Sequence, residues 1–141
     1  MTKSTVLNLG IAMLVGVLMC GCATTAKGPS DEELIATGTE ECLAAAMAKD
    51  IDGLLEHYSD DFYNYEVGDK DGLKGFLEDA KTMGYLDNLE VDLDEAETEI
   101  DGDTASVSPV ILNGVFGTVT LGFDLIKKDG EWQITNMEIS L

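Results

Sequence analysis

Arginine is absent from this 141-residue chain, and its eight basic residues, all lysines, stand against 28 Asp and Glu. The formal charge of -20 opposes binding to nucleic acid or to an anionic membrane surface, because both partners require a basic patch. Two prolines and 6% aromatic residues give no low-complexity signature, and 45% hydrophobic residues are too many for a disordered chain. The length suits one domain of roughly 100–150 residues, which excludes a multidomain enzyme.

Histidine and cysteine are also scarce. His57 is the only histidine, and Cys42 is the only cysteine beyond the N-terminal segment, so the ligands of a usual zinc site are lacking. The acidic run from Asp87 to Asp103 lacks the glycine that a calcium loop of the EF-hand type needs after Asp92 and Asp94. Its acids alternate with apolar residues instead, which indicates a strand with a solvated acidic face. We therefore predict no metal ion and no cofactor.

The N-terminal segment has the pattern of a secretory signal peptide. Lys3 is its only charge, and the uncharged run Val6–Met19 is too short for a comfortable membrane span of ~20 apolar residues. An N-terminal membrane helix is the alternative, and the residues that follow argue against it. We expect residues 1–21 to be removed as a signal peptide.

The stretch Leu18–Thr25 resembles the lipobox of bacterial lipoproteins, in which a small residue precedes a cysteine that is diacylated. Gly21 precedes Cys22, whereas the bulky Met19 precedes Cys20, so the resemblance implies lipidation at Cys22. Residues 22–29 would then be the lipidated cysteine and a short tether to the domain. The implied location is the bacterial cell envelope, on a membrane reached through a palmitate-type anchor. Ala23 after the cysteine points to the outer membrane where two membranes are present. With Cys22 acylated, Cys42 has no disulfide partner, which favours a buried structural cysteine over a nucleophile.

The first half of the domain, residues 30–141, has helical signals. Ser30 and Glu33 form a capping-box pattern, and apolar residues then recur at helical spacing until about Lys49. Asp50 is placed to cap a second helix, and Gly84 is placed to terminate a third. The expected elements are helices over 30–49, 50–58 and 71–80, with a short strand over 62–67.

In the second half the period changes to two, which is typical of strands. Strands are expected over 89–93, 105–112, 115–125 and 132–139. Three hairpin-type dipeptides, Asp101-Gly102, Asn113-Gly114 and Asp129-Gly130, mark the turns. Helices followed by an antiparallel meander predict an α+β fold in which the helices cover one face of the sheet.

The segment Ala48–Phe62 resembles the nuclear transport factor 2-like (NTF2-like) superfamily, which includes SnoaL-like polyketide cyclases and ketosteroid isomerases. It has a small residue before Asp50 in the loop between two helices, and an aromatic residue two positions before Asp60-Asp61 ahead of the first strand. The later strands, with Gly130–Ile134, match the same plan, so the resemblance covers residues ~31–141. It implies a cone-shaped domain with three N-terminal helices packed on a curved antiparallel sheet.

The resemblance to the isomerases also suggests catalytic positions. Counting from Asp50, the general base falls on Glu66, whose pKa would rise if it were buried at the mouth of an apolar cone. Cys42 occupies the position of the oxyanion tyrosine, and a thiol is a weak donor. Asp124 is the nearest candidate for the second donor. The alternative for Glu66 is a solvated residue that closes a short edge strand.

Two functions from different classes follow. The first is a non-catalytic, membrane-anchored module whose cone binds a small apolar ligand or a protein partner. The second is an isomerase, cyclase or dehydratase with Glu66 as the base. Acids on the outer face of the sheet predict a monomer or a weak homodimer, since a two-fold interface would bring each acid against its own copy. The expected pocket-lining residues are Leu54, Tyr58, Phe62, Phe76, Val107, Leu121, Phe123 and Trp132.

Overall fold

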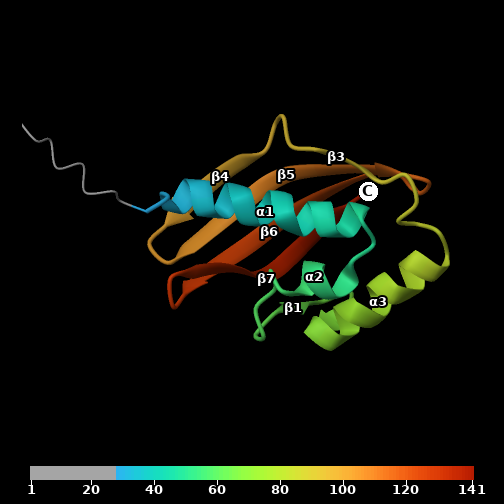
Figure 1. Ribbon diagram of the computed structural model, residues 1–141, viewed down its shortest axis with the longest axis horizontal. Helices are drawn as coiled ribbons and strands as arrows, with labels where there is room; N and C mark the ends of the chain where they lie inside the picture. The colour runs from blue at the N-terminus through green and yellow to red at the C-terminus, as the bar shows by residue number, and fades with distance from the viewer. Residues whose placement is uncertain (1–27) are drawn as a thin grey trace, which may run out of the picture.

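The computed structural model describes residues 28–141 (Figure 1). The predicted signal peptide, Cys22 and most of the tether lie outside the described residues. Within residues 28–141, no helix combines the length and apolar character needed to cross a membrane. The elements in chain order are α1 (Asp31–Met47), α2 (Ile51–Leu55), β1 (Tyr63–Asn64), β2 (Gly68–Asp69), α3 (Lys70–Thr82), β3 (Glu90–Asp92), β4 (Glu97–Asp101), β5 (Thr104–Gly114), β6 (Gly117–Lys128) and β7 (Glu131–Ser140).

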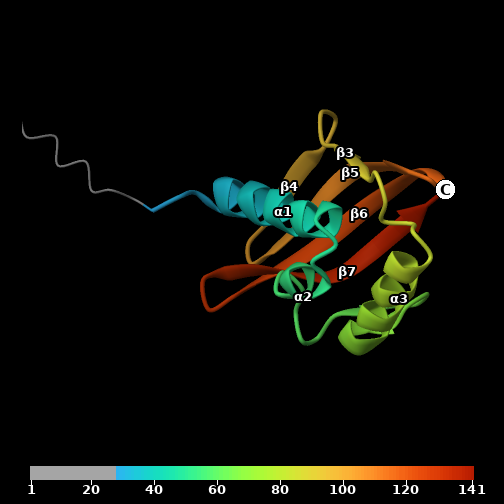
Figure 2. The same ribbon diagram turned by 45° about the vertical axis from the view of Figure 1, so that its right-hand side comes forward.

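The main sheet is antiparallel and has the order β3-β5-β6-β7. β3 and β4 both pair with β5, at opposite ends of that long strand, so together they form one interrupted edge. β1 and β2 form a separate small hairpin. Figures 1 and 2 show α1, α2 and α3 on the same side of the main sheet, which leaves its other face uncovered. This arrangement is the expected α+β architecture.

Local signals position the helices as expected. Ser30 Oγ accepts a hydrogen bond from Glu33 N at 3.2 Å, and Ser30 N donates to Glu33 Oε2 at 2.8 Å, which completes the capping box. Asp50 Oδ1 caps α2 by accepting from Gly53 N at 3.1 Å. Gly84, with a φ of 80°, follows the end of α3 in the left-handed region that glycine adopts without a steric penalty.

The second helix and the first strand are shorter than predicted. α2 ends at Leu55, and Tyr58 forms an isolated bridge with Ile134 of β7 instead of continuing the helix. The strand expected over 62–67 is reduced to the two residues of β1. Asn64 explains the reduction, because its Oδ1 accepts from the backbone N–H groups of Glu66 and Val67 at 2.7 and 3.1 Å and turns the chain there.

Two of the three predicted turns are displaced along the chain. Asp129-Gly130 is the two-residue loop expected, with φ values of 54° and 82°. Asp101 pairs with Thr104, so the first loop is shifted by one residue to 102–103. Gly114 pairs with Gly117, so the middle loop is 115–116 and not Asn113-Gly114. The ring of Phe116 packs so closely over Gly114 that a Cβ there would lie 2.7 Å from Phe116 Cε1.

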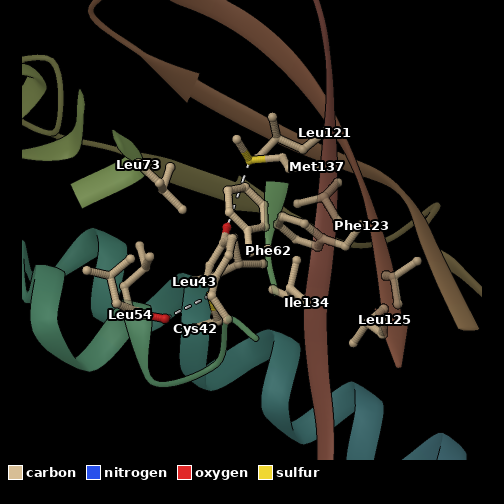
Figure 3. Packing of buried hydrophobic residues seen from close by; sticks show 14 of the residues in the cluster. Cys42, Leu43, Leu54, Phe62, Leu73, Leu121, Phe123, Leu125, Ile134 and Met137 are labelled. Carbon is tan, nitrogen blue, oxygen red and sulfur yellow. Dashed lines mark hydrogen bonds between the residues drawn. The ribbon is translucent and has the colours of Figure 1, made fainter. Parts of the chain in front are cut away.

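The core lies between the helices and the covered face of β5, β6 and β7 (Figure 3). Phe62, Leu73, Phe123 and Ile134 are each at most 2% exposed. In the described part of the chain, the two buried clusters extend from Ile35 to Met137.

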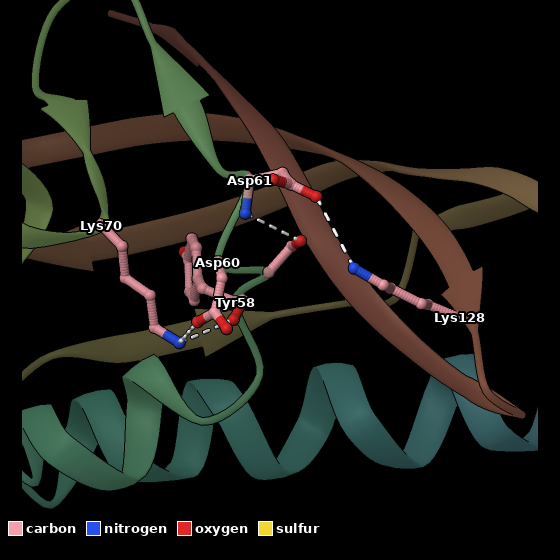
Figure 4. Close-up of polar contacts among 6 residues, drawn as sticks. Tyr58, Asp60, Asp61, Lys70 and Lys128 are labelled. Atoms are coloured by element: carbon pink, nitrogen blue, oxygen red, sulfur yellow. Dashed lines mark hydrogen bonds and ion pairs between the residues drawn. The ribbon is translucent and has the colours of Figure 1, made fainter.

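Lysines connect elements that are distant in the sequence. Lys70, at the start of α3, donates to Tyr58 O at 2.9 Å and lies 3.3 Å from Asp60 Oδ1, as Figure 4 shows. Lys128 Nζ at the end of β6 lies 3.8 Å from Asp61 Oδ2. The other ion pairs among residues 28–141 are Lys49–Asp87, Lys74–Asp52 and Lys127–Asp31.

Candidate ligand-binding cavity

An apolar cavity of about 290 Å³ lies between the helices and the sheet, near the lower end of the range for small-molecule sites. Its walls come from the last two turns of α1, from α2, α3 and the segment after α3, and from the inward-facing side chains of the sheet. None of the lining side chains carries a charge. They are Cys42, Leu43, Ala46, Leu54, Tyr58, Leu73, Phe76, Leu77, Ala80, Tyr85, Leu86, Leu89, Leu112, Phe116, Val119, Leu121, Phe123, Met137, Ile139 and Leu141.

Cys42 contributes a thiol to the α1 wall. Its Sγ donates to Leu54 O at 3.9 Å, a weak contact that joins α1 to α2 (Figure 3). Burial raises the pKa of the thiol to about 12, because the thiolate would lose its hydration without gaining a positive partner. Cys42 is therefore a neutral, buried side chain at physiological pH.

Tyr58 contributes a buried phenol. Its ring meets Phe62 edge to face with centroids 5.0 Å apart, and its hydroxyl donates to Met137 Sδ at 3.8 Å. Burial, with a smaller effect from Cys42, raises the pKa of Tyr58 well above its usual value. A thioether is a weak acceptor, so the Tyr58 hydroxyl remains available to a better acceptor placed in the cavity.

Large apolar side chains are exposed among the lining residues. Phe76 on α3, Tyr85 after α3 and Phe116 in the β5–β6 loop are 51%, 46% and 40% exposed, and Leu141 is fully exposed. Such a group of exposed aromatic and aliphatic side chains is uncommon on a soluble domain unless it meets a ligand or partner. We take these four residues as the mouth of the cavity.

The structure places five of the predicted pocket residues in the wall of this cavity: Leu54, Tyr58, Phe76, Leu121 and Phe123. Three others do not line it. Phe62 and Val107 are packed in the core, and Trp132 lies beside the first half of α1, where its Nε1 donates to Asp31 Oδ1 at 3.1 Å.

The two candidate catalytic carboxylates lie outside the cavity. Glu66 is exposed in the turn that Asn64 organises between β1 and β2. Asp124 is exposed on the uncovered face of β6, because its neighbours Phe123 and Leu125 point inward, and it accepts from Asn136 Nδ2 at 3.0 Å. The structure therefore does not bring Glu66, Asp124 and Cys42 into one site.

Sequence reasoning missed the residues of the mouth outside α3. Tyr85 follows the glycine that ends α3, and Phe116 lies within the strand expected over 115–125. An aromatic residue between two expected elements is the signal that could have found Tyr85, whereas the alternation that predicted the strand gave none for Phe116. Across residues 28–141, no three His, Cys, Asp or Glu side chains gather closely enough to hold a metal ion.

No protein-family model and no curated protein sequence matches this chain. Solved structures do match. A protein of unknown function from Pseudomonas putida superposes with a TM-score of 0.66 at 18% identity, over 80% of this chain and 89% of that one, and is described as NTF2-like. The fold is NTF2-like.

Other NTF2-like structures agree. A protein of unknown function from Shewanella oneidensis gives a TM-score of 0.64 at 16% identity, over 79% of this chain and 100% of that one. A candidate ketosteroid isomerase from Shewanella frigidimarina gives 0.62 at 21% identity, over 74% and 92%. The expected NTF2-like α+β fold is thus confirmed, and at these identities the likeness concerns the fold alone.

Proposed function

We propose that this protein is a lipid-anchored envelope protein whose NTF2-like domain binds a small apolar ligand without transforming it. The observation that carries the binding function is the cavity of about 290 Å³, which has an uncharged wall and exposed aromatic side chains at its mouth. Filling such a cavity and covering its mouth removes apolar surface from water, which stabilises a complex by ~25 cal/mol per Å² before the costs of association.

The chemistry of the wall favours binding over catalysis. Proton abstraction needs a base whose pKa lies near the working pH. Among the described residues, Cys42, Tyr58 and Tyr85 are the titratable side chains that line the cavity, and burial keeps the first two protonated. Glu66, the base of the alternative isomerase, cyclase or dehydratase, lies in an exposed turn. The alternative therefore lacks a carboxylate at the place where an apolar substrate would sit.

The anchoring part of the proposal rests on the sequence. Cys22 would carry the lipid and residues 23–29 the tether, with the outer membrane as the expected location where two membranes are present. The domain has 28 acids and six lysines, so anionic lipid headgroups would repel it and the attachment would depend on the acyl chains.

The proposed oligomeric state is a monomer or a weak homodimer. Register places Glu90 and Asp92 of β3, with Glu97 and Glu99 of β4, on the uncovered face at one edge of the sheet. Two copies that met through this edge would place like charges against each other. A protein partner on the same face would need basic groups.

The binding function is tested by filling the cavity. Ala46 of α1 lines the cavity, whereas Ala44 in the same helix is exposed. We expect Ala46→Phe to weaken binding of an uncharged naphthylamine dye by at least about tenfold, the equivalent of ~1.4 kcal/mol, while Ala44→Phe leaves it unchanged. Val119→Phe, on the opposite wall, repeats the test from β6 in case Ala46→Phe unfolds the domain. Equal dye binding by folded forms of all three variants would refute the proposal, as would the absence of binding by the unaltered chain.

A further inference from the structure

The side chains that line the cavity offer hydrogen-bonding groups but no charge to a ligand. Of its lining side chains, only the hydroxyls of Tyr58 and Tyr85 and the thiol of Cys42 carry a polar hydrogen. Tyr58 is buried at 3% exposure with only the sulfur of Met137 as its acceptor, whereas Tyr85 is 46% exposed at the mouth. A bound molecule can therefore have a polar head, but that head must be satisfied by neutral donors or by water.

Each lysine of the described chain is held by a carboxylate or a carbonyl group of the protein, and none of them lines the cavity. Lys49, the nearest in sequence to the α1 wall, pairs with Asp87, and Lys81 donates to Lys49 O at 3.1 Å. Lys74 lies 2.9 Å from Asp52 Oδ1 on the side of α2. The other three bind Asp31, Asp60 and Asp61.

The segment that supplies the lining residues Tyr85, Leu86 and Leu89 contains no lysine, and its Asp87 is occupied by the ion pair with Lys49. The potential at the mouth is therefore set by the net charge of the domain, in which 28 acids stand against six lysines. An anionic head at this mouth would meet the negative potential of the whole domain and would gain no cation in return for its lost hydration. An uncharged head avoids both costs.

We propose that the cavity selects uncharged amphiphiles, lipid-like molecules with a hydroxyl, ester or ketone head, and discriminates against carboxylates such as free fatty acids. This inference rests on the proposed binding function and adds the charge of the ligand to it. The apolar body fills the space between α3 and the sheet, and the head hydrogen-bonds at the mouth or to Tyr58.

The test compares 1-decanol with decanoate, which share one chain and differ in the charge of the head. The full-length protein is titrated with each at about pH 8, where decanoate is ionised. At about 0.01 M salt we expect decanoate to bind at least about tenfold more weakly than decanol. We expect the difference between the affinities for decanol and decanoate to become smaller at about 0.5 M salt, where charges at the solvent-exposed mouth are screened.

A substitution at the mouth supplies the missing cation. Val115 is 61% exposed and shares the β5–β6 loop with Phe116. We expect Val115→Lys to strengthen decanoate binding several-fold and to leave decanol binding unchanged. Thr37→Lys changes the net charge equally on an exposed position of α1 outside the cavity wall and is the matched control.

The outcomes separate this inference from the function on which it rests. Decanoate and decanol binding with equal affinity would overturn the selectivity and leave the binding function intact. An equal gain in decanoate affinity from Thr37→Lys and Val115→Lys would also overturn the selectivity. The gain would then come from the net charge of the domain and not from the position of the lysine at the mouth. Failure of both molecules to bind, together with failure of the dye, would overturn the binding function itself.

Discussion

Lys127 Nζ on β6 lies 2.8 Å from Asp31 Oδ1 in the first turn of α1, and this ion pair joins the start of the domain to its last hairpin. Trp132 Nε1 donates to the same oxygen at 3.1 Å. One carboxylate thus holds together residues that are about 100 positions apart, at the end of the sheet remote from the cavity mouth.

Asp31→Asn should lower the melting temperature at neutral pH. Hydrogen bonds from Lys127, and then from Trp132, lower the pKa of Asp31 below 3.8 in the folded chain. Stability from such a group is present above its unfolded pKa and is lost as the pH falls through the lower folded pKa. The difference in melting temperature between Asp31→Asn and the unaltered chain should therefore disappear in strong acid.

Trp132 is the only tryptophan, so its fluorescence reports on this contact directly. Its emission should change as Asp31 is protonated, and the change should be absent in Asp31→Asn. Asp61→Asn is the control, because its pair with Lys128 is longer, at 3.8 Å, and its side chain is 82% exposed. If Asp61→Asn removed the pH-dependent change in Trp132 emission as Asp31→Asn does, the contact between Asp31 and Trp132 would not be its cause.

The thiol of Cys42 should resist alkylation in the folded domain. With a pKa of about 12 in place of 9.0, its thiolate fraction at about pH 8 is lower by a factor of about 1,000, and burial adds a steric barrier. The rate of reaction with a disulfide reagent should rise by at least this factor on unfolding in denaturant. A native rate close to the unfolded rate would show that the thiol is accessible.

Alanine substitutions at Phe62 and Phe76 should have different effects, the first on the stability of the domain and the second on ligand binding. Phe62 is 1% exposed and packs against Tyr58 outside the cavity wall, so Phe62→Ala should destabilise the domain by about 3–5 kcal/mol. Phe76 is 51% exposed at the mouth, so Phe76→Ala should cost less than about 1 kcal/mol yet weaken dye binding. Denaturant titration and dye titration of both variants check the pair, and loss of stability in Phe76→Ala would contradict its assignment to the mouth.

Glu66→Gln and Asp124→Asn should leave ligand affinity within about twofold of the unaltered chain. Both carboxylates are exposed and neither lines the cavity. The enzymatic alternative makes the opposite prediction for Glu66→Gln, which would abolish turnover of an unsaturated ketone. Turnover by the unaltered chain that Glu66→Gln removes would establish the alternative.

Cys22→Ala should abolish palmitate labelling and release the protein from membranes. In the proposal the acyl chains on Cys22 make the attachment, because anionic headgroups would repel a domain with 28 acids and six lysines. Cys20→Ala is the matched control and should keep its label. Labelling that persists in Cys22→Ala and vanishes in Cys20→Ala would move the lipid to Cys20.

Features set by neighbouring residues could be predicted from the sequence, and those set by distant contacts could not. The caps at Ser30 and Asp50 and the turn at Asp129 need only a few adjacent residues, and all three occur as expected. The β5–β6 loop does not, because Phe116 packs back over Gly114 and reaches the mouth of a cavity formed by the whole fold.

The candidate site shows the same division. The alternation of Leu121, Phe123 and Leu125 placed these residues inward and already put Asp124 on the opposite face. Glu66 was selected by counting from Asp50 as in the ketosteroid isomerases, which assumed a strand over 62–67. The hydrogen bonds of Asn64 end that strand before Glu66. Side-chain alternation was thus the better guide to the wall of the cavity.

The path of α1 has a consequence for the direction in which the cavity opens. The helix is 17 residues long, about 25 Å, and only its last two turns, through Cys42, Leu43 and Ala46, reach the cavity. Residue 28 precedes its opposite end, as Figures 1 and 2 show. On a domain tethered through Cys22, a ligand would therefore enter at the end of the domain opposite to the one that the tether joins.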